Sequence, residues 1–184
     1  MTKIQVYEKR FEALTLLRLG LSVSIVSKCS ELPPSFVREM HKKLFLTASR
    51  SGPLKEVNGI LKNTRVMIQA SIILKNYISI GNNIFKEVDI DALIKAYDIY
   101  SDCFYRSQLD KDNLWQSISL NHAWQLCRGL ISKEIKLRVC PKGCTYIESN
   151  NQNLKLQCQL CYLIKIELGR IKKRKRKRRL KLAE

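Results

Sequence analysis

Cys140-Pro-Lys-Gly-Cys144 and, after thirteen further residues, Cys158-Gln-Leu-Cys161 form two close cysteine pairs on either side of a short excursion of the chain. Each pair can place two sulfurs about 2.3 Å from one ion, and the excursion can return the second pair to the first. Pro141 and Gly143 favour a tight turn within the first pair. The spacing predicts one structural Zn²⁺ per chain, with the ligands Cys140, Cys144, Cys158 and Cys161.

The residues around the cysteines predict a small module. A hairpin framed by four apolar residues is expected between the two pairs, and these residues are Tyr146, Ile147, Leu154 and Leu156. The first pair has three intervening residues rather than the commoner two, so its knuckle is expected to be slightly wider. Lys142 lies within that knuckle and can offset part of the thiolate charge.

The composition predicts a mainly α protein with three parts. A helical domain is expected over residues 1–132, the four-cysteine zinc module over 133–167 and a basic, disordered tail over 168–184. The chain has 34 Lys and Arg against 16 Asp and Glu, and its formal net charge is +18. Such a charge favours a polyanionic partner, above all nucleic acid.

The sequence also bears on the compartment. No stretch approaches the roughly 20 apolar residues of a membrane span, and the first residues lack the apolar core of a secretory signal. Seven cysteines, four of them at metal spacing, fit a reducing cytosol better than a disulfide framework. We therefore expect a cytoplasmic protein without a membrane partner.

Two short helices over residues 21–30 and 35–44, joined by Glu31-Leu-Pro-Pro34, are typical of a helix-turn-helix unit at about residues 21–45. Six residues can form the apolar seam between the helices, namely Val26, Cys29, Leu32, Val37, Met40 and Leu44. Arg38, His41 and Lys42 are then expected on the outward side, where they could reach base edges or phosphates. The alternative is a pair of helices with a solvated basic face.

Further helices are expected over residues 2–19, within 58–80, from Asp89 or Asp91, and over 114–131 after a turn at 110–113. Some residues of these helices are of types that also occur in functional sites, and we interpret them as structural. Trp115 and Trp124 are expected to pack within the last helix, and His122 to have a satisfied surface or core role. The remaining cysteines are expected to be small buried hydrophobes, and they are Cys29, Cys103 and Cys127.

The chain ends in a basic run, in which ten of the twelve residues from Arg170 to Lys181 are Lys or Arg. Like charges repel and little apolar burial offsets ordering, so residues 170–179 are expected to be disordered when free. On DNA, each phosphate contact would release counterions. The predicted contacts are Arg170, Lys172, Lys173, Arg174, Lys175 and Arg176 in the tail and Lys142 and Lys155 in the module. The alternative is a tail that only aids solubility.

Three segments together resemble the FlhC family of bacterial flagellar transcriptional regulators. They are Asp91-Ala-Leu-Ile-Lys-Ala-Tyr-Asp-Ile-Tyr100, Ala123-Trp124 with Arg128, and the four-cysteine module, and the resemblance covers about residues 10–165. It implies a mostly helical protein with zinc on the four cysteines and a hetero-oligomer with the small helical protein FlhD. It also implies transcription activation upstream of promoters, with RNA polymerase as a further partner. The long Lys/Arg tail is not a general feature of the family.

These observations favour a transcription activator that binds double-stranded DNA. Relatives of FlhC on mobile elements activate conjugative transfer genes, so the resemblance implies either flagellar or transfer operons as targets. The alternative is a general or RNA-directed nucleic-acid-binding zinc protein, for which the tail and the module would suffice. An enzyme is disfavoured, because the sequence has no Ser/His/Asp set and a four-thiolate zinc offers no open position for water.

Overall fold

The computed structural model describes residues 3–49, 52, 54–82, 84–106, 115–150 and 157–181, with the side chains of Lys3 and of residues 171–181 left out. Within these residues the chain is mainly α, as predicted. The elements in order are α1 (Lys3–Arg18), α2 (Val23–Ser30), α3 (Pro34–Phe45), α4 (Val57–Ile60), α5 (Thr64–Ile80), α6 (Ile90–Arg106), α7 (Leu120–Ile131), β1 (Ile135–Val139), β2 (Thr145–Ser149) and α8 (Gln159–Lys181).

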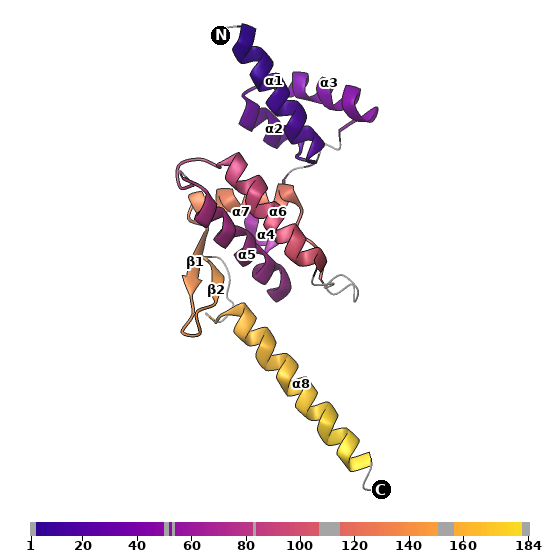
Figure 1. Ribbon diagram of the computed structural model, residues 1–184, viewed down its shortest axis with the longest axis vertical. Helices are drawn as coiled ribbons and strands as arrows, with labels where there is room; N and C mark the ends of the chain where they lie inside the picture. The colour runs from indigo at the N-terminus through magenta and orange to yellow at the C-terminus, as the bar shows by residue number, and fades with distance from the viewer. Residues whose placement is uncertain are drawn as a thin grey trace.

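The first three helices pack on one another at one end of the molecule (Figure 1). Gly20 ends α1 with a φ of 83°, a left-handed conformation that glycine adopts at little cost. Pro34 lies in the first turn of α3, where its missing N–H has no intrahelical partner to lose. The positions predicted for α1, α2 and α3 are therefore confirmed to within a few residues.

A larger helical layer follows, with α5 at its centre in contact with α6, α7, α8 and both strands. Asn63 caps α5, because its Oδ1 accepts a hydrogen bond of 2.9 Å from the Val66 N–H. Asp89 caps α6 in the same way, accepting from the Ala92 N–H at 3.0 Å. The buried side of α5 includes Met67, Ile73 and Tyr77, each 1% exposed or less.

One asparagine joins the first three helices to this layer. Asn121 of α7 donates through Nδ2 to the Gly20 carbonyl at 2.9 Å and accepts through Oδ1 from the Ser22 N–H at 2.7 Å. Both backbone groups lie in the turn between α1 and α2. The amide thus satisfies a donor and an acceptor that helix ends leave without partners.

The start of α7 differs from the prediction. The helix begins at Leu120, with Ser119 as its cap, rather than at Leu114, which lies outside the described residues. The reason is a long-range contact, since the hydroxyls of Tyr97 and Tyr100 hydrogen-bond the Ile118 carbonyl and N–H and hold that residue outside the helix. Tyr100 in turn donates to Gln69 at 2.5 Å.

The aromatic and cysteine predictions for this layer have mixed outcomes. Trp124 is buried in α7 as predicted, whereas Trp115 precedes the helix and is half-buried, with Arg65 over its ring at 5.8 Å. Cys127 is buried as predicted, but Cys103 is exposed on α6, so that prediction was wrong. Cys103 lies on the solvent side because Tyr100 and Phe104 occupy the buried side of the same turn.

The hairpin also differs from the prediction. β1 pairs with β2 in antiparallel register, from Ile135 opposite Ser149 to Val139 opposite Thr145. The first cysteine pair therefore lies in the hairpin turn, and the strand that pairs with β2 among the described residues precedes that pair. Ile135 and Ile147 are fully buried against the helical layer, which fixes this pairing. Leu154 and Leu156 lie outside the described residues.

The basic tail is the largest departure. It was predicted to be disordered, but α8 continues through it to Lys181 and projects well beyond the rest of the molecule (Figure 1). The helix is already nucleated in its first turn, each further residue adds one backbone hydrogen bond, and Lys and Arg are good helix formers. The division at residues 132 and 167 stays a prediction about folding units. Among the described residues, no helix has the length and apolar content that crossing a membrane requires.

Candidate metal centre and nucleic-acid interface

The four cysteines predicted to bind zinc lie close together in the structure. The Sγ atoms of Cys140, Cys144, Cys158 and Cys161 all lie within 4.8 Å of one another. Cys161 Sγ is 3.9 Å from the Sγ atoms of both Cys140 and Cys144. A tetrahedron with metal–sulfur bonds of about 2.3 Å has edges of about 3.8 Å, so these separations fit a single tetrahedral ion.

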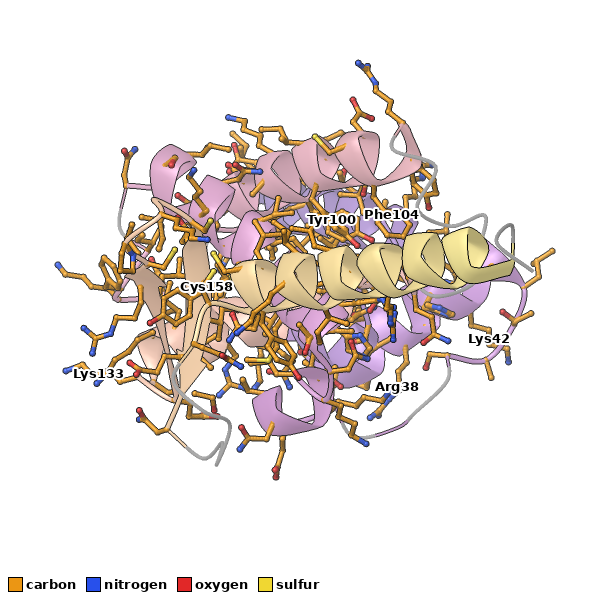
Figure 2. All side chains as sticks on the ribbon, turned by 90° about the horizontal axis from the view of Figure 1, so that it is seen from below. Arg38, Lys42, Tyr100, Phe104, Lys133 and Cys158 are labelled. Atoms are coloured by element: carbon orange, nitrogen blue, oxygen red, sulfur yellow. The ribbon has the colours of Figure 1, made fainter. Side chains whose placement is uncertain are left out.

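Two local structures bring the sulfurs together. In the hairpin turn the Cys140 N–H donates to the Cys144 carbonyl at 2.9 Å, and the Gly143 N–H donates to the Cys140 carbonyl at 2.8 Å. Gly143 has a φ of 79°, which the turn requires. Cys158, which is labelled in Figure 2, directly precedes α8, and Cys161 lies in the first turn of that helix.

A polar contact holds α8 to the hairpin independently of the sulfurs. The side-chain amide of Gln159 donates to the Ile147 carbonyl of β2 at 2.9 Å. At the end of β2, Ser149 donates to Asn58 of α4 at 3.1 Å. The strand that carries the first knuckle is thus tied both to α8 and to the helical layer.

The thiols are not equivalent in acidity. Burial raises the pKa of Cys140, but N–H groups of Cys144 and Lys142 and the neighbouring thiols donate to its thiolate and lower the pKa to about 7. Burial and donation of its own S–H to the other sulfurs raise the pKa of Cys161 to about 12. The low pKa of Cys140 favours its thiolate, whereas burial and S–H donation oppose ionisation of Cys161, a cost that a bound cation would offset.

The donor set therefore fits a metal ion. Four thiolates in a tetrahedron suit Zn²⁺ or an iron–sulfur centre, and zinc would be bound here by all four residues with no open position. Such a closed site would supply structure rather than a reaction. Cys158 is buried and the other three cysteines are half-buried, so the site lies just under the surface.

The α2–α3 pair has the seam that the sequence predicted. Val26 and Val37 are fully buried, and the half-buried residues packed against the core include Cys29, Leu32, Met40 and Leu44. Glu31 ends α2 in the left-handed region with a φ of 55°, and only Glu31–Pro33 separate the two helices. Two short helices joined by a three-residue connection fit the predicted helix-turn-helix unit, which stays a prediction.

The outward side of α3 carries two of the three predicted contacts. Arg38 and Lys42 are exposed one turn apart, and Figure 2 shows both at the periphery on the same side of the molecule. His41 is half-buried instead, with its ring 4.8 Å from that of Phe45. Its Nδ1 is shielded and has no hydrogen-bond partner among the described residues. A DNA-contacting role for the three residues stays a prediction.

The remaining predicted contacts are spread over the C-terminal part. Lys142 is exposed in the hairpin turn, and Arg170 is exposed on α8 with Glu167 at 2.6 Å. Lys155 lies outside the described residues. The backbone of α8 is described through the other predicted positions but their side chains are not, namely Lys172, Lys173, Arg174, Lys175 and Arg176.

An exposed apolar stripe on α1 was not predicted. Ile4, Tyr7 and Phe11 are 70%, 68% and 73% exposed, while Ala13 and Leu17 of the same helix are buried. The sequence signal was present, because the two sets fall on different helical faces at a spacing of three and four residues. An apolar set beyond the one that packs is typical of a surface that contacts a partner.

The sequence matches a model of a known protein family. A family model described as "Flagellar transcriptional activator (FlhC)" matches residues 4–177, from the exposed stripe of α1 through the cysteine cluster and into the basic part of α8. A search of curated proteins gave no match.

Proposed function

The chain belongs to the FlhC family of flagellar transcriptional activators, and we propose that it activates transcription by binding double-stranded DNA together with a small helical protein of the FlhD type. The complex would recruit RNA polymerase to flagellar operons or, on a mobile element, to conjugative transfer operons. The protein would work in the cytoplasm. The family is one of activators rather than enzymes.

The observation that carries the proposal is the exposed basic side of α3. This helix buries Val37 against the core, and the opposite side presents Arg38 and Lys42 one turn apart. A helix held in this way can lie in the major groove, which is wide enough to admit it. An arginine there can donate two hydrogen bonds to a guanine edge, whereas a lysine also suits a phosphate.

The stripe of Ile4, Tyr7 and Phe11 supports a protein partner. At these exposures the three side chains together leave on the order of several hundred Å² of apolar surface in contact with water. This area is as large as the largest apolar patch of a typical monomer. We assign the stripe to the FlhD-type subunit, whose helices could pack along α1. Phe11→Glu should prevent co-purification with that subunit, while zinc content and the helical signal stay unchanged. Retained co-purification would move the interface elsewhere.

The metal in this proposal is one structural Zn²⁺. Its four ligands tie the hairpin turn to the start of α8, and no step of transcription activation passes through it. Elemental analysis of the purified chain should give about one zinc per chain, and iron in its place would contradict the assignment.

DNA recognition by α3 is tested with Arg38→Ala in the purified complex. Loss of a bidentate base contact should weaken binding to the preferred site by about 1–3 kcal/mol and relax the preference at one base pair. Lys75→Ala is the control, because it removes the same charge from an exposed position on α5. A uniform loss across sequences would make Arg38 a phosphate contact, and no loss would exclude α3 as the reading helix.

A second candidate is a general or RNA-directed nucleic-acid-binding protein, favoured by the ten basic residues from Arg170 to Lys181 in α8. Crosslinking in cells followed by sequencing separates the two. A shared promoter motif would support the activator, whereas enrichment of RNA would support the second candidate.

A further inference from the structure

α8 consists of two unlike parts. The first, up to Leu168, directly follows Cys158, carries Cys161 of the sulfur cluster and rests on α5 of the helical layer. The second, from Arg170 to Lys181, is the basic run. Gly169 is the only glycine of the helix and lies between them. In the sequence of α8, Glu167 is the only acidic residue.

The first part is fixed to the body. Tyr162, Leu163 and Ile166 face the start of α5 across a cavity of about 230 Å³, which Arg170 also lines. Gln159 donates to β2 at 2.9 Å, and Cys158 and Cys161 belong to the sulfur cluster. The direction in which α8 leaves the body is therefore set before the basic run begins (Figure 1).

Gly169 has no packing role that would explain it. A Cβ added there would meet no described atom within 4 Å, and its φ lies outside the left-handed range. Glycine in the middle of a helix costs about 1 kcal/mol relative to alanine, because the unfolded chain gains freedom. The residue thus weakens the helix at the junction of its two parts.

The helical state of the basic run matches the charge spacing of duplex DNA. Twelve residues at about 1.5 Å each span about 18 Å, so ten charges give one per about 1.8 Å. Duplex DNA carries one negative charge per about 1.7 Å of its axis. The same run in an extended conformation, at about 3.3 Å per residue, would give one charge per about 4 Å and would match a single strand instead.

The basic run also lacks the pattern of a membrane-surface helix. Ile171 and Leu180 are its only apolar residues, so the helix has no continuous apolar face to insert into lipid. Its like charges at i and i+4 destabilise it when free, and phosphates would remove that repulsion. Duplex DNA is therefore the partner that the observations favour.

Resting on the DNA binding proposed above, we infer that α8 is a jointed arm that docks on the phosphates of double-stranded DNA as a helix, with residues 159–168 as its fixed base and Gly169 as its joint. The arm would hold about five base pairs. It would add affinity without reading sequence.

Two substitutions at the joint test this in the zinc-loaded complex, because both keep all ten charges. Gly169→Ala stiffens the joint and should tighten binding to a duplex of about 30 base pairs by up to about fivefold, the equivalent of about 1 kcal/mol. Gly169→Pro breaks the helix there and should weaken duplex binding by about fivefold or more. The dependence of affinity on salt should be shallower for the proline variant, since fewer phosphates are neutralised.

The controls separate this inference from the proposed function. Gly59→Ala, also at an open helical position, should leave duplex binding unchanged. A single strand of the same sequence should bind all variants alike. Equal duplex affinity of the wild type and both Gly169 variants, with zinc content intact, would overturn the arm and leave the proposed function standing. Equal changes on the single strand would also overturn it. If no variant binds the duplex, both proposals fail.

Discussion

Two basic helices among the described residues, α3 and α8, are held in position by different means. α3 rests on a seam of buried apolar side chains, with Val26 and Val37 at its centre. α8 begins at a cluster of four sulfurs and one amide contact from Gln159. The position of α3 therefore rests mainly on apolar burial, whereas that of α8 would also rest on the proposed metal ion.

The difference follows from the length of chain available to each part. The first three helices bury enough apolar surface to hold a short helix pair, at about 1.5–3 kcal/mol for each large side chain removed from water. The hairpin has five residues in each strand, and a two-stranded sheet of this size is marginal without further support. Metal ligation can provide that support.

Removing one sulfur should produce the largest effect. Cys158→Ser should lose zinc and, with it, hydrogen-exchange protection in the hairpin and in the first turns of α8, because structural zinc contributes on the order of 10 kcal/mol in small modules. The α2–α3 pair should keep its protection. Cys103→Ser is the control, since that cysteine is exposed and outside the cluster. Full protection of α8 without zinc would remove the metal from its anchoring.

Weakening the buried core of the first three helices should do the reverse. Ile25 of α2 is fully buried, so Ile25→Ala should cost about 2–5 kcal/mol of unfolding free energy in the first three helices. DNA recognition through α3 should fall, while zinc content stays at the wild-type value. Ser24→Ala, on the exposed side of the same helix, is the matched control. Loss of zinc in the Ile25 variant would show that the two ends are not independent.

A similar difference between regions explains which features of the structure could be predicted from the sequence. The α2–α3 unit and the cysteine cluster follow from short-range rules, namely apolar spacing, Pro34 in the first turn of a helix, and the cysteine pairs. The start of α7 and the partner of β2 depend on contacts far apart in the chain, such as Tyr100 with Ile118 and Ile147 with the helical layer. Contacts between residues so far apart in the chain cannot be predicted from a short stretch of sequence.

α8 shows a different reason for failure. Repulsion among like charges predicted disorder from residue 170, yet the helix continues to Lys181. The rule treats the run as an isolated segment that must form its own first turn, whereas here the turn at Cys158 has already been formed. Helix propensity of Lys and Arg then favours continuation.

As the pH rises, the helical layer around α5 should lose stability at a lower pH than the α2–α3 seam does. Burial raises the pKa of Tyr77 and of Tyr100 to about 12, so the folded state holds their protons more tightly than the unfolded chain. Stability from this source is complete below about pH 10 and is lost as the pH rises from 10 to 12, by on the order of 2 kcal/mol for each tyrosine. Denaturation at pH 8, 10 and 11 would measure it, and Tyr100→Phe should reduce the fall. An equal fall in that variant would assign it to other groups.

The smallest expected effect concerns the end of α3. Leu46 has a φ of 55° and is 89% exposed, so a bulky side chain occupies a left-handed position without gaining burial. Leu46→Gly should raise the stability of the first three helices by about 0.5–1 kcal/mol, because glycine adopts this conformation without a clash. Gly20→Ala makes the opposite change at a φ of 83° and should lower stability by a similar amount. Thermal unfolding of both variants would measure these two changes in stability. Neither should alter zinc affinity, because both lie in the part of the molecule that apolar burial holds, and a shift in zinc binding would contradict that separation.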